Sequence, residues 1–298
     1  QKFKEAYSGS FDGQGHTISG LHIDNGDANY QALFSYIANS TISRLTVEGT
    51  VRGRQYVAGI VGLQDEESTT DRCVNHVKVI ATYGVAGGVV SHHNAWSATT
   101  SNCINLTTIT APSLAGGVVG SNFITSHVYH CLGIGEVVAN SAHGACVGGN
   151  GSKDNVSDNY GTHEYAITGG QTLVTEEQLR SGEVAWLLGE AFGQNLGTEP
   201  DAAVADTIPV IDGMKVFKVS YTTNSTAQAD SLYTNGTLPT HDATGNWELT
   251  WRTAPDGEVI TKVTTDSTLY AELKDVSGVK EISNDPRAIV GNQPTYDL

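Results

Sequence analysis

Short apolar runs, each broken by Gly, Asn, Ser or Thr, recur at a fixed interval through the first half of the chain. A Gly-Ile-Val-Gly run begins at residue 59 and returns in related form at offsets of 29, 29 and 28 residues, with a fainter copy 27 residues earlier. The copies occupy residues 32–35, 59–62, 88–91, 117–120 and 145–148. None of these segments shows the i, i+3, i+4, i+7 spacing of an amphipathic helix. The pattern therefore predicts a repeat built from short β-strands.

Two further positions keep the same interval. One position holds Leu45, Cys73, Cys103, Cys131 and then Asn159. The other is β-branched and holds Val51, Val79, Ile109 and Val137. One unit of this kind cannot bury its apolar side alone, but stacked units give every backbone group a partner about 4.8 Å away. We therefore expect a β-solenoid over residues 1–165, with coils of about 28–29 residues and ladders of like residues inside.

The cysteine position has two interpretations. Each Cys is either a small buried hydrophobic residue, which we favour, or one half of a disulfide between neighbouring coils, whose separation lies near the allowed Cα distance. Side chains of one ladder point the same way, which fits the disulfide torsion poorly. No CxxC pair occurs, which argues against a zinc or redox motif.

The repeated residues resemble GLUG repeats, which occur in bacterial surface and secreted proteins. Residues 7–21, which include Phe-Asp-Gly-Gln-Gly-His-Thr-Ile, resemble the coil that typically precedes such repeats. The resemblance covers roughly residues 3–165 and implies a mainly β fold, a right-handed parallel β-helix. It implies no single activity, because these repeats are found in adhesins and as accessory segments of secreted enzymes. Two of the copies lack the first Gly, as terminal coils that cap a stack often do.

The period ends at residue 166, and a helical pattern follows. Thr175, with Gln178 three residues later, forms a capping box, and the apolar helical face that follows ends near Gly189. We expect residues 166–212 to be a capping segment with one α-helix over the open end of the solenoid, because an uncovered last coil exposes unpaired N–H and C=O groups. The segment also resembles the one that commonly follows GLUG coils.

Alternating apolar and polar residues return in the last third of the chain. The predicted strands are residues 215–221, 247–251, 259–263 and 264–273. An Asp-Gly turn signal stands at 256–257. Their order resembles the internalin-type B repeat, a surface-protein module, and we expect a small β domain over residues 213–274. Residues 275–298 resemble the start of the C-terminal sorting tail of Bacteroidetes secreted proteins, so we expect a linker or tail there.

Composition and charge narrow the classes of partner but name no chemistry. The chain has 298 residues and 34 Gly, with 16 Lys+Arg against 32 Asp+Glu, a net charge of −16. Such acidity argues against a nucleic-acid partner, which needs a basic face. No apolar run of 18 residues exists, so we expect no transmembrane segment. The sequence begins inside a motif, and we read both ends as cut from a larger, surface-anchored chain.

One acidic cluster lies between the Gly-Ile-Val-Gly run and Cys73. It consists of Asp65, Glu66, Glu67 and Asp71. Carboxylates so placed form a solvated acidic loop, a Ca²⁺ site with hard oxygen ligands, or a carboxylate pair of the glycosidase type. We favour the loop, because no other coil carries an acidic residue in the equivalent position. Ca²⁺ is the one cofactor that this cluster suggests.

Aromatic and histidine residues occupy the equivalent loop of the next two coils. His92 and His93 precede Trp96, and Phe123 takes the matching place one coil later. Adjacent histidines can bind metal, but on a strand they point to opposite sides, so we favour a surface loop. If a glycan binds here, Trp96 is the natural stacking platform and Phe123 extends a shallow aromatic groove.

These observations together predict an extracellular or outer-membrane surface protein with a non-catalytic role in adhesion, glycan binding or domain presentation. Its expected partner is an extracellular glycan or a host surface protein. A polysaccharide lyase or glycoside hydrolase of the β-helix type is the alternative, and an inert structural stalk is the third class. The sequence contains no P-loop, G-x-S-x-G or H-E-x-x-H motif, and we predict no catalytic residues.

Overall fold

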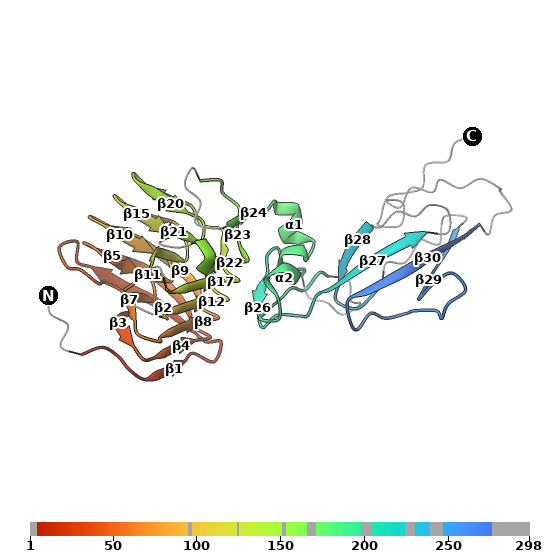
Figure 1. Ribbon diagram of the computed structural model, residues 1–298, viewed down its shortest axis with the longest axis horizontal. Helices are drawn as coiled ribbons and strands as arrows, with labels where there is room; N and C mark the ends of the chain where they lie inside the picture. The colour runs from red at the N-terminus through yellow and green to blue at the C-terminus, as the bar shows by residue number, and fades with distance from the viewer. Residues whose placement is uncertain are drawn as a thin grey trace. The chain divides into compact units, whose positions relative to one another are not determined.

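The protein is mainly β and contains two compact units, residues 1–176 and 177–298, in a computed structural model (Figure 1). The first unit is a parallel β-solenoid of about 5 turns, as the sequence predicts. The structure describes residues 5–94, 97–123, 125–150, 153–165, 171–197, 204–223, 230–238 and 247–275.

Four parallel sheets form the sides of the solenoid, and the chain visits them in a fixed order, D, A, B and C. Sheet D consists of β6 (Val57–Ala58), β10 (Val85–Gly87), β15 (Leu114–Gly116) and β20 (Ala142–Gly144). Sheet A consists of β3 (Phe34–Ala38), β7 (Val61–Asp65), β11 (Val90–His93), β16 (Val119–Asn122) and β21 (Val147–Asn150). The stack of arrows from β3 to β21 is visible in Figure 1.

The other two sides complete each coil. Sheet B consists of β1 (Ser10–Asp12), β4 (Thr41–Ser43), β8 (Thr69–Asp71), β12 (Thr99–Ser101), β17 (His127–Tyr129) and β22 (Val156–Ser157). Sheet C consists of β2 (Thr17–Asp24), β5 (Thr46–Gly53), β9 (Val74–Ala81), β13 (Ile104–Asn105), β14 (Ile109–Ala111), β18 (Leu132–Gly133), β19 (Val137–Ala139), β23 (Asn159–Gly161) and β24 (Gln171–Leu173). A short 3₁₀ turn, Lys153–Asn155, precedes β22.

The repeated positions stack in register and face the core. Val61, Val90, Val119 and Val147 pair along sheet A. Val51, Val79, Ile109 and Val137 pair along sheet C. All of these side chains are buried. The sequence period therefore equals one turn of the solenoid, which confirms the predicted ladders.

The Gly-rich tetrapeptides begin at the corner between sheets D and A rather than within a strand. Gly88 and Val89 connect β10 to β11. A Cβ on Gly88 would lie 1.9 Å from the carbonyl oxygen of Gly117 in the next coil, and one on Gly117 would lie 1.8 Å from that of Ala145. Successive coils can therefore approach this closely only without a side chain. Ala145 carries a methyl group because β20 and β21 are the outermost strands of their sheets.

A left-handed residue marks the corner between sheets B and C. Arg44, Arg72, Asn102, His130 and Asp158 have φ angles of 50–53°. Each of them turns the chain so that the next residue, in the cysteine position, enters the core. His130 therefore lies in this bend with a partly exposed side chain, whereas the next residue, Cys131, is fully buried.

Two short helices, α1 (Glu176–Arg180) and α2 (Glu183–Leu188), take the place of the single helix predicted for residues 166–212. The first helix begins directly after Thr175, the predicted N-cap. Gly182 then adopts a left-handed φ of 88°, which interrupts the helical backbone. The second helix ends at Gly189, as the sequence indicates. That this segment covers the solenoid end stays a prediction.

The second unit also contains a four-stranded sheet in the order β28-β27-β30-β29. Its strands are β27 (Phe217–Thr223), β28 (Asp230–Thr234), β29 (Trp247–Arg252) and β30 (Ser267–Asp275), and β25 (Phe192–Gly193) pairs separately with β26 (Val210–Ile211). The ring of Tyr221 packs edge-on against that of Trp251 with centroids 5.3 Å apart, in a core with Val219 and Leu269.

The predicted strand at 259–263 is wrong in detail. Val259 and Lys262 form only isolated bridges, because Asp256, with a φ of 61°, and Gly257 turn the chain sharply just before them. The Asp-Gly turn itself is confirmed by the hydrogen bond from the Gly257 N–H to the Ala254 carbonyl oxygen. Beyond Asp275, the predicted tail lies outside the described residues.

Candidate functional site

Asp65, the first residue of the predicted acidic cluster, links neighbouring coils. It ends β7 and is 7% exposed. Its Oδ2 accepts a hydrogen bond from the Tyr36 hydroxyl at 3.2 Å and another from Asn94 Nδ2 at 3.0 Å, in the coils before and after it. Burial and the Asp65 charge raise the pKa of Tyr36. The carboxylate is thus held by donors of the solenoid itself.

Glu66 and Glu67 form the turn that follows. Both residues are exposed, with left-handed φ angles of 30° and 42°. Glu66 Oε2 accepts a hydrogen bond from Asn39 Nδ2 at 2.8 Å in the preceding coil. The pair behaves as the solvated acidic turn that the sequence favours.

Asp71 belongs to a separate set of contacts at the end of β8. Its Oδ1 accepts hydrogen bonds from Ser101 Oγ at 2.8 Å and from Asn102 Nδ2 at 2.7 Å, both in the next coil. Among the described residues, no three His, Cys, Asp or Glu side chains come together in a way that suits a metal ion. The Ca²⁺ site therefore stays a prediction that the geometry of these residues does not support.

His93 is a core residue, so its assignment to a surface binding groove is wrong. The side chain is fully buried in β11. Its Nδ1 lies 2.6 Å from Asn122 Oδ1, and its Nε2 lies 2.9 Å from Thr100 Oγ1. Burial lowers the pKa of His93 to about 4; the Asn122 hydrogen bond opposes that shift, and the nearby His92 and His127 add to it. The imidazole is therefore neutral near pH 7.

The same inward position carries a polar residue in neighbouring coils. Gln64 pairs in register with His93 and is also fully buried. Its Nε2 donates to the carbonyl oxygens of Ser68 and Thr99, both at 2.8 Å, and its Oε1 accepts from Thr70 Oγ1 at 2.8 Å. A column of hydrogen-bonded polar side chains thus runs through the corner between sheets A and B, since each unpaired buried polar group would cost free energy.

His92 points the other way along the same strand. Its ring packs against that of Tyr56 with centroids 5.0 Å apart, and Tyr56 stacks on Tyr30 at 5.1 Å. Burial lowers the pKa of His92, and the Asp65 charge acts in the opposite direction. Phe123, the other described member of the predicted groove, is 40% exposed. Trp96 lies outside the described residues, so the groove stays a prediction.

Cys73, Cys103 and Cys131 form the buried column that the sequence favours, and Cys146 lies outside it, at the corner between sheets D and A. All four thiols are free, and all are buried. Cys73, Cys103 and Cys131 each donate a hydrogen bond to the backbone carbonyl oxygen two residues earlier, at 3.3, 3.0 and 3.3 Å. Burial raises the pKa of Cys103 and of Cys146 well above the ordinary value. Such thiols are poor nucleophiles, because the thiolate is the reactive form.

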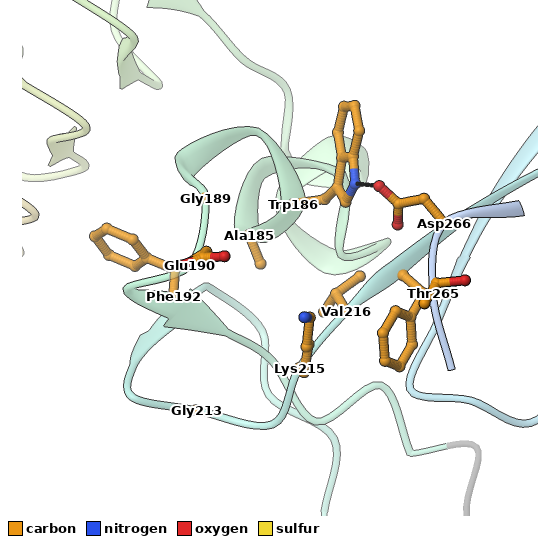
Figure 2. Close-up of a pocket in the computed structure, with 11 residues that line it drawn as sticks. Ala185, Trp186, Gly189, Glu190, Phe192, Gly213, Lys215, Val216, Thr265 and Asp266 are labelled. Carbon is orange, nitrogen blue, oxygen red and sulfur yellow. Dashed lines mark hydrogen bonds between the residues drawn. The ribbon is translucent and has the colours of Figure 1, made fainter. Parts of the chain in front are cut away.

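A cavity of about 690 Å³ lies in the second unit, between α2, the segment that leads into β27, and the residues that precede β30 (Figure 2). Its apolar lining includes Ala185, Phe192 and Val216, which are 1%, 5% and 6% exposed. Glu190 and Lys215 are exposed and lie on its rim. The cavity therefore joins an apolar surface to charged groups.

Trp186, at the cavity wall, is held by a residue far away in the sequence. Its Nε1–H donates to Asp266 Oδ2 at 2.8 Å, and Asp266 Oδ1 accepts from the Lys218 backbone N–H at 2.8 Å. Lys218 Nζ lies 4.7 Å from the centroid of the indole ring, a favourable cation–π distance. Figure 2 shows the indole N–H directed at the Asp266 carboxylate. These contacts fix the orientation of the ring.

The side chains of Glu190 and Lys215 are directed toward the interior of the cavity (Figure 2). Lys215 Nζ lies 5.5 Å from the centroid of the Phe217 ring. Neither charge forms an ion pair with another residue in the part of the chain that the structure describes. The cavity thus offers one hydrogen-bond acceptor and one donor that are free to meet a ligand.

Sequence reasoning missed this cavity. It placed Trp186 on the apolar helical face and Lys215 in a strand; Trp186 does lie in α2, whereas Lys215 precedes β27, which begins at Phe217. The pairing of Trp186 with Asp266 spans 80 residues and leaves no local signal. An exposed acidic residue directly after the helix-ending Gly189 is the only hint, and it is weak.

Comparisons with protein-family models, with curated proteins and with solved structures found no match for this chain. Its class therefore rests on the fold, which is a mainly β protein with a parallel β-solenoid and a small β sheet. No helix among the described residues has both the length and the apolar character needed to cross a membrane.

Proposed function

We propose that this chain is a non-catalytic surface protein in which the solenoid is a stiff scaffold and the second unit carries a ligand-binding site. The observation that carries the proposal is the use of polar side chains in the solenoid. Asp65, Asp71, His93 and Gln64 all hydrogen-bond to residues of other coils. Polar groups committed in this way stiffen a stack, and a stiff stack holds a binding module away from its anchor.

The resemblance to GLUG repeats belongs to this proposal. It is supported by the match between the Gly-rich tetrapeptides and the corners of successive coils, where a Cβ would meet a backbone carbonyl oxygen. We also propose an internalin-like module over residues 213–274 and a Bacteroidetes-type sorting tail after it, on the sequence motifs alone. These assignments place the protein outside the cell or on the outer membrane, where it would serve adhesion, glycan binding or presentation of other domains.

The experiment that tests the proposal has two arms. In the first, the full chain is applied to an array of host, plant and microbial glycans and to cultured host cells, and we expect saturable binding to at least one of them. In the second, it is incubated with a panel of polysaccharides and followed by reducing-sugar release and by absorbance at about 235 nm, which detects products of lyase action. Product formation in the second arm would contradict the proposal and favour the β-helix lyase or hydrolase class. Absence of binding in the first arm would leave an inert stalk.

A further inference from the structure

We propose that the cavity of the second unit is a saccharide-binding site in which Lys215 donates and Glu190 accepts hydrogen bonds to ligand hydroxyl groups. The inference rests on the proposed function and names the surface that performs the binding. This surface lies outside the groove that the sequence predicts around Trp96 and Phe123.

The shape and lining of the cavity fit a sugar ring. At about 690 Å³ it falls within the roughly 300–1,000 Å³ that is usual for small-molecule sites. The half-buried rings of Trp186 and Phe217 give it an apolar surface, and the buried side chains of Ala185, Phe192 and Val216 lie behind them. A pyranose presents C–H groups on its faces and hydroxyl groups on its edges, so its faces meet such a surface while its edges need polar partners.

The aromatic wall is positioned before any ligand arrives. Asp266 accepts the indole N–H of Trp186, and Lys218 lies against the ring. A side chain that is already ordered loses little conformational entropy on binding, which favours affinity. Because the indole N–H is engaged with Asp266, hydrogen bonding to the ligand falls to Lys215 and Glu190.

The two rim charges favour a neutral, hydroxyl-rich ligand over other classes. A purely apolar ligand would displace water from Lys215 and Glu190 without replacing the lost hydrogen bonds, which costs free energy. A polyanion would meet an acidic surrounding, since residues 166–298 carry 19 Asp+Glu against 8 Lys+Arg. An extended peptide could not add to the sheet at this point, because β27 and β30 are each paired on both sides.

The test uses the full chain and defined probes, namely hexasaccharides of glucose, xylose, mannose and galacturonic acid, titrated by calorimetry and saturation-transfer NMR. We expect a neutral hexasaccharide to bind, and Lys215→Met and Glu190→Gln each to weaken it about tenfold or more, the usual effect of losing a hydrogen bond to a charged group. Lys262→Met and Glu258→Gln are the matched controls, because both residues are exposed in the same unit and lie outside the cavity lining. Circular dichroism verifies that all four variants fold.

Each other outcome overturns the inference in a distinct way. Unchanged affinity in Lys215→Met and Glu190→Gln, or loss of affinity only in Trp96→Ala, would remove the cavity as the site and leave the proposed function intact. Binding of only the galacturonate hexamer would assign the site to acidic sugars and refute the neutral ligand. If the full chain binds none of the probes and no glycan on the array but still adheres to host cells, the saccharide site is refuted while the surface-binding function stands.

Discussion

His93 shows how one residue can make the solenoid sensitive to pH. The imidazole sits in the core with a partner on each ring nitrogen, Asn122 and Thr100, and it stays neutral there because burial disfavours its charged form. Gln64 fills the same position one coil earlier with an uncharged amide. A residue at this position therefore needs hydrogen-bonding groups but no charge. Of these two residues, only His93 has a side chain that titrates.

We predict that His93 destabilises the fold in acid. The pKa of His93 is about 4 in the folded protein, against 6.5 for the ordinary side chain. Well above pH 6.5 the residue is neutral in both states and contributes no pH dependence. As the pH falls from 6.5 toward 4, His93 binds a proton in the unfolded chain but not in the folded protein. The free energy of unfolding therefore falls by about 3 kcal/mol over this window. Urea unfolding at a series of pH values measures the change.

The variant His93→Gln, which copies the residue at position 64, provides the control. It should keep hydrogen bonding in the column while removing the titration, so its unfolding free energy should change less between pH 6.5 and 4 than that of the unaltered protein. If the unfolding free energy of the two proteins changed equally with pH, the imidazole would be protonated as readily in the folded protein as in the unfolded chain.

Glycine corners give a second prediction at the residue scale. A Cβ on Gly117 would lie 1.8 Å from the Ala145 carbonyl oxygen, and backbone cannot move aside as a side chain can. We expect Gly117→Ala to destabilise the protein by about 3 kcal/mol or more, at the upper end of overpacking effects. Gly149→Ala is the matched control: its nearest neighbour is the Leu114 side chain at 3.1 Å. Equal unfolding midpoints in denaturant for the two variants would contradict the packing argument.

At the scale of the element, each corner of the solenoid has its own stacking chemistry. Sheets B and C meet at a left-handed residue followed by the cysteine position, and sheet C begins with an amide ladder. Asn75 Nδ2 donates to Asn105 Oδ1 at 2.8 Å across the coils and to the Val77 carbonyl oxygen at 3.0 Å within its own coil. The ladder ends at Gly133, which stands where the preceding coils carry Asn. A Cβ on Gly133 would lie 1.9 Å from the carbonyl oxygen of Ala145, so no side chain fits there.

The buried thiols give a prediction about their reactivity. Because all four thiols are free and buried, and burial raises the pKa of Cys103 and Cys146, we expect almost no reaction with Ellman's reagent in the native protein at pH 8. In denaturant all four of them should react. A count of two thiols after unfolding without reductant would reveal a disulfide between coils and contradict the structure.

At the scale of the whole molecule, the first unit is a one-dimensional stack in which each coil contacts mainly its neighbours. Register pairs run without interruption from β3 through β7, β11 and β16 to β21. The stability of such a stack is close to a sum of coil and interface contributions. A coil is therefore a removable unit, provided that the ladders on both sides of the cut still match.

We predict that deletion of residues 88–116, one full coil, leaves a folded protein. The deletion joins Gly87 to Gly117, so that Val119 stacks on Val61 and Cys131 on Cys73. Far-UV circular dichroism should keep its β character, and thermal unfolding should remain cooperative at a lower temperature. Deletion of residues 88–101 is the control, because it would place a sheet C segment where sheet A must follow. Folding of the half-coil deletion to the same degree would refute the register argument.

Sequence by itself determined the solenoid, its coil length and three of its ladders, because each repeated position meets a copy of itself in the next coil. Residues one period apart in the sequence are therefore neighbours in space. This self-contact also explains why the Cys position, the Val61 position and the Val51 position were assigned correctly. Local signals rather than the period predicted the Asp-Gly turn at 256–257 and the two ends of the helical segment, at Thr175 and Gly189.

Only the tertiary structure decided what the polar residues do. His93 and Trp96 look alike as candidates in the sequence, but burial and the Asn122 and Thr100 contacts place His93 in the core. Asp65 and Asp71 stand close together in the chain, yet they bond to different neighbours. The pairing of Trp186 with Asp266 joins segments that share no period, so the cavity between them could not be found from spacing. Local pattern specifies which face of an element is apolar, whereas the partner of a polar group is set by the packing of distant segments.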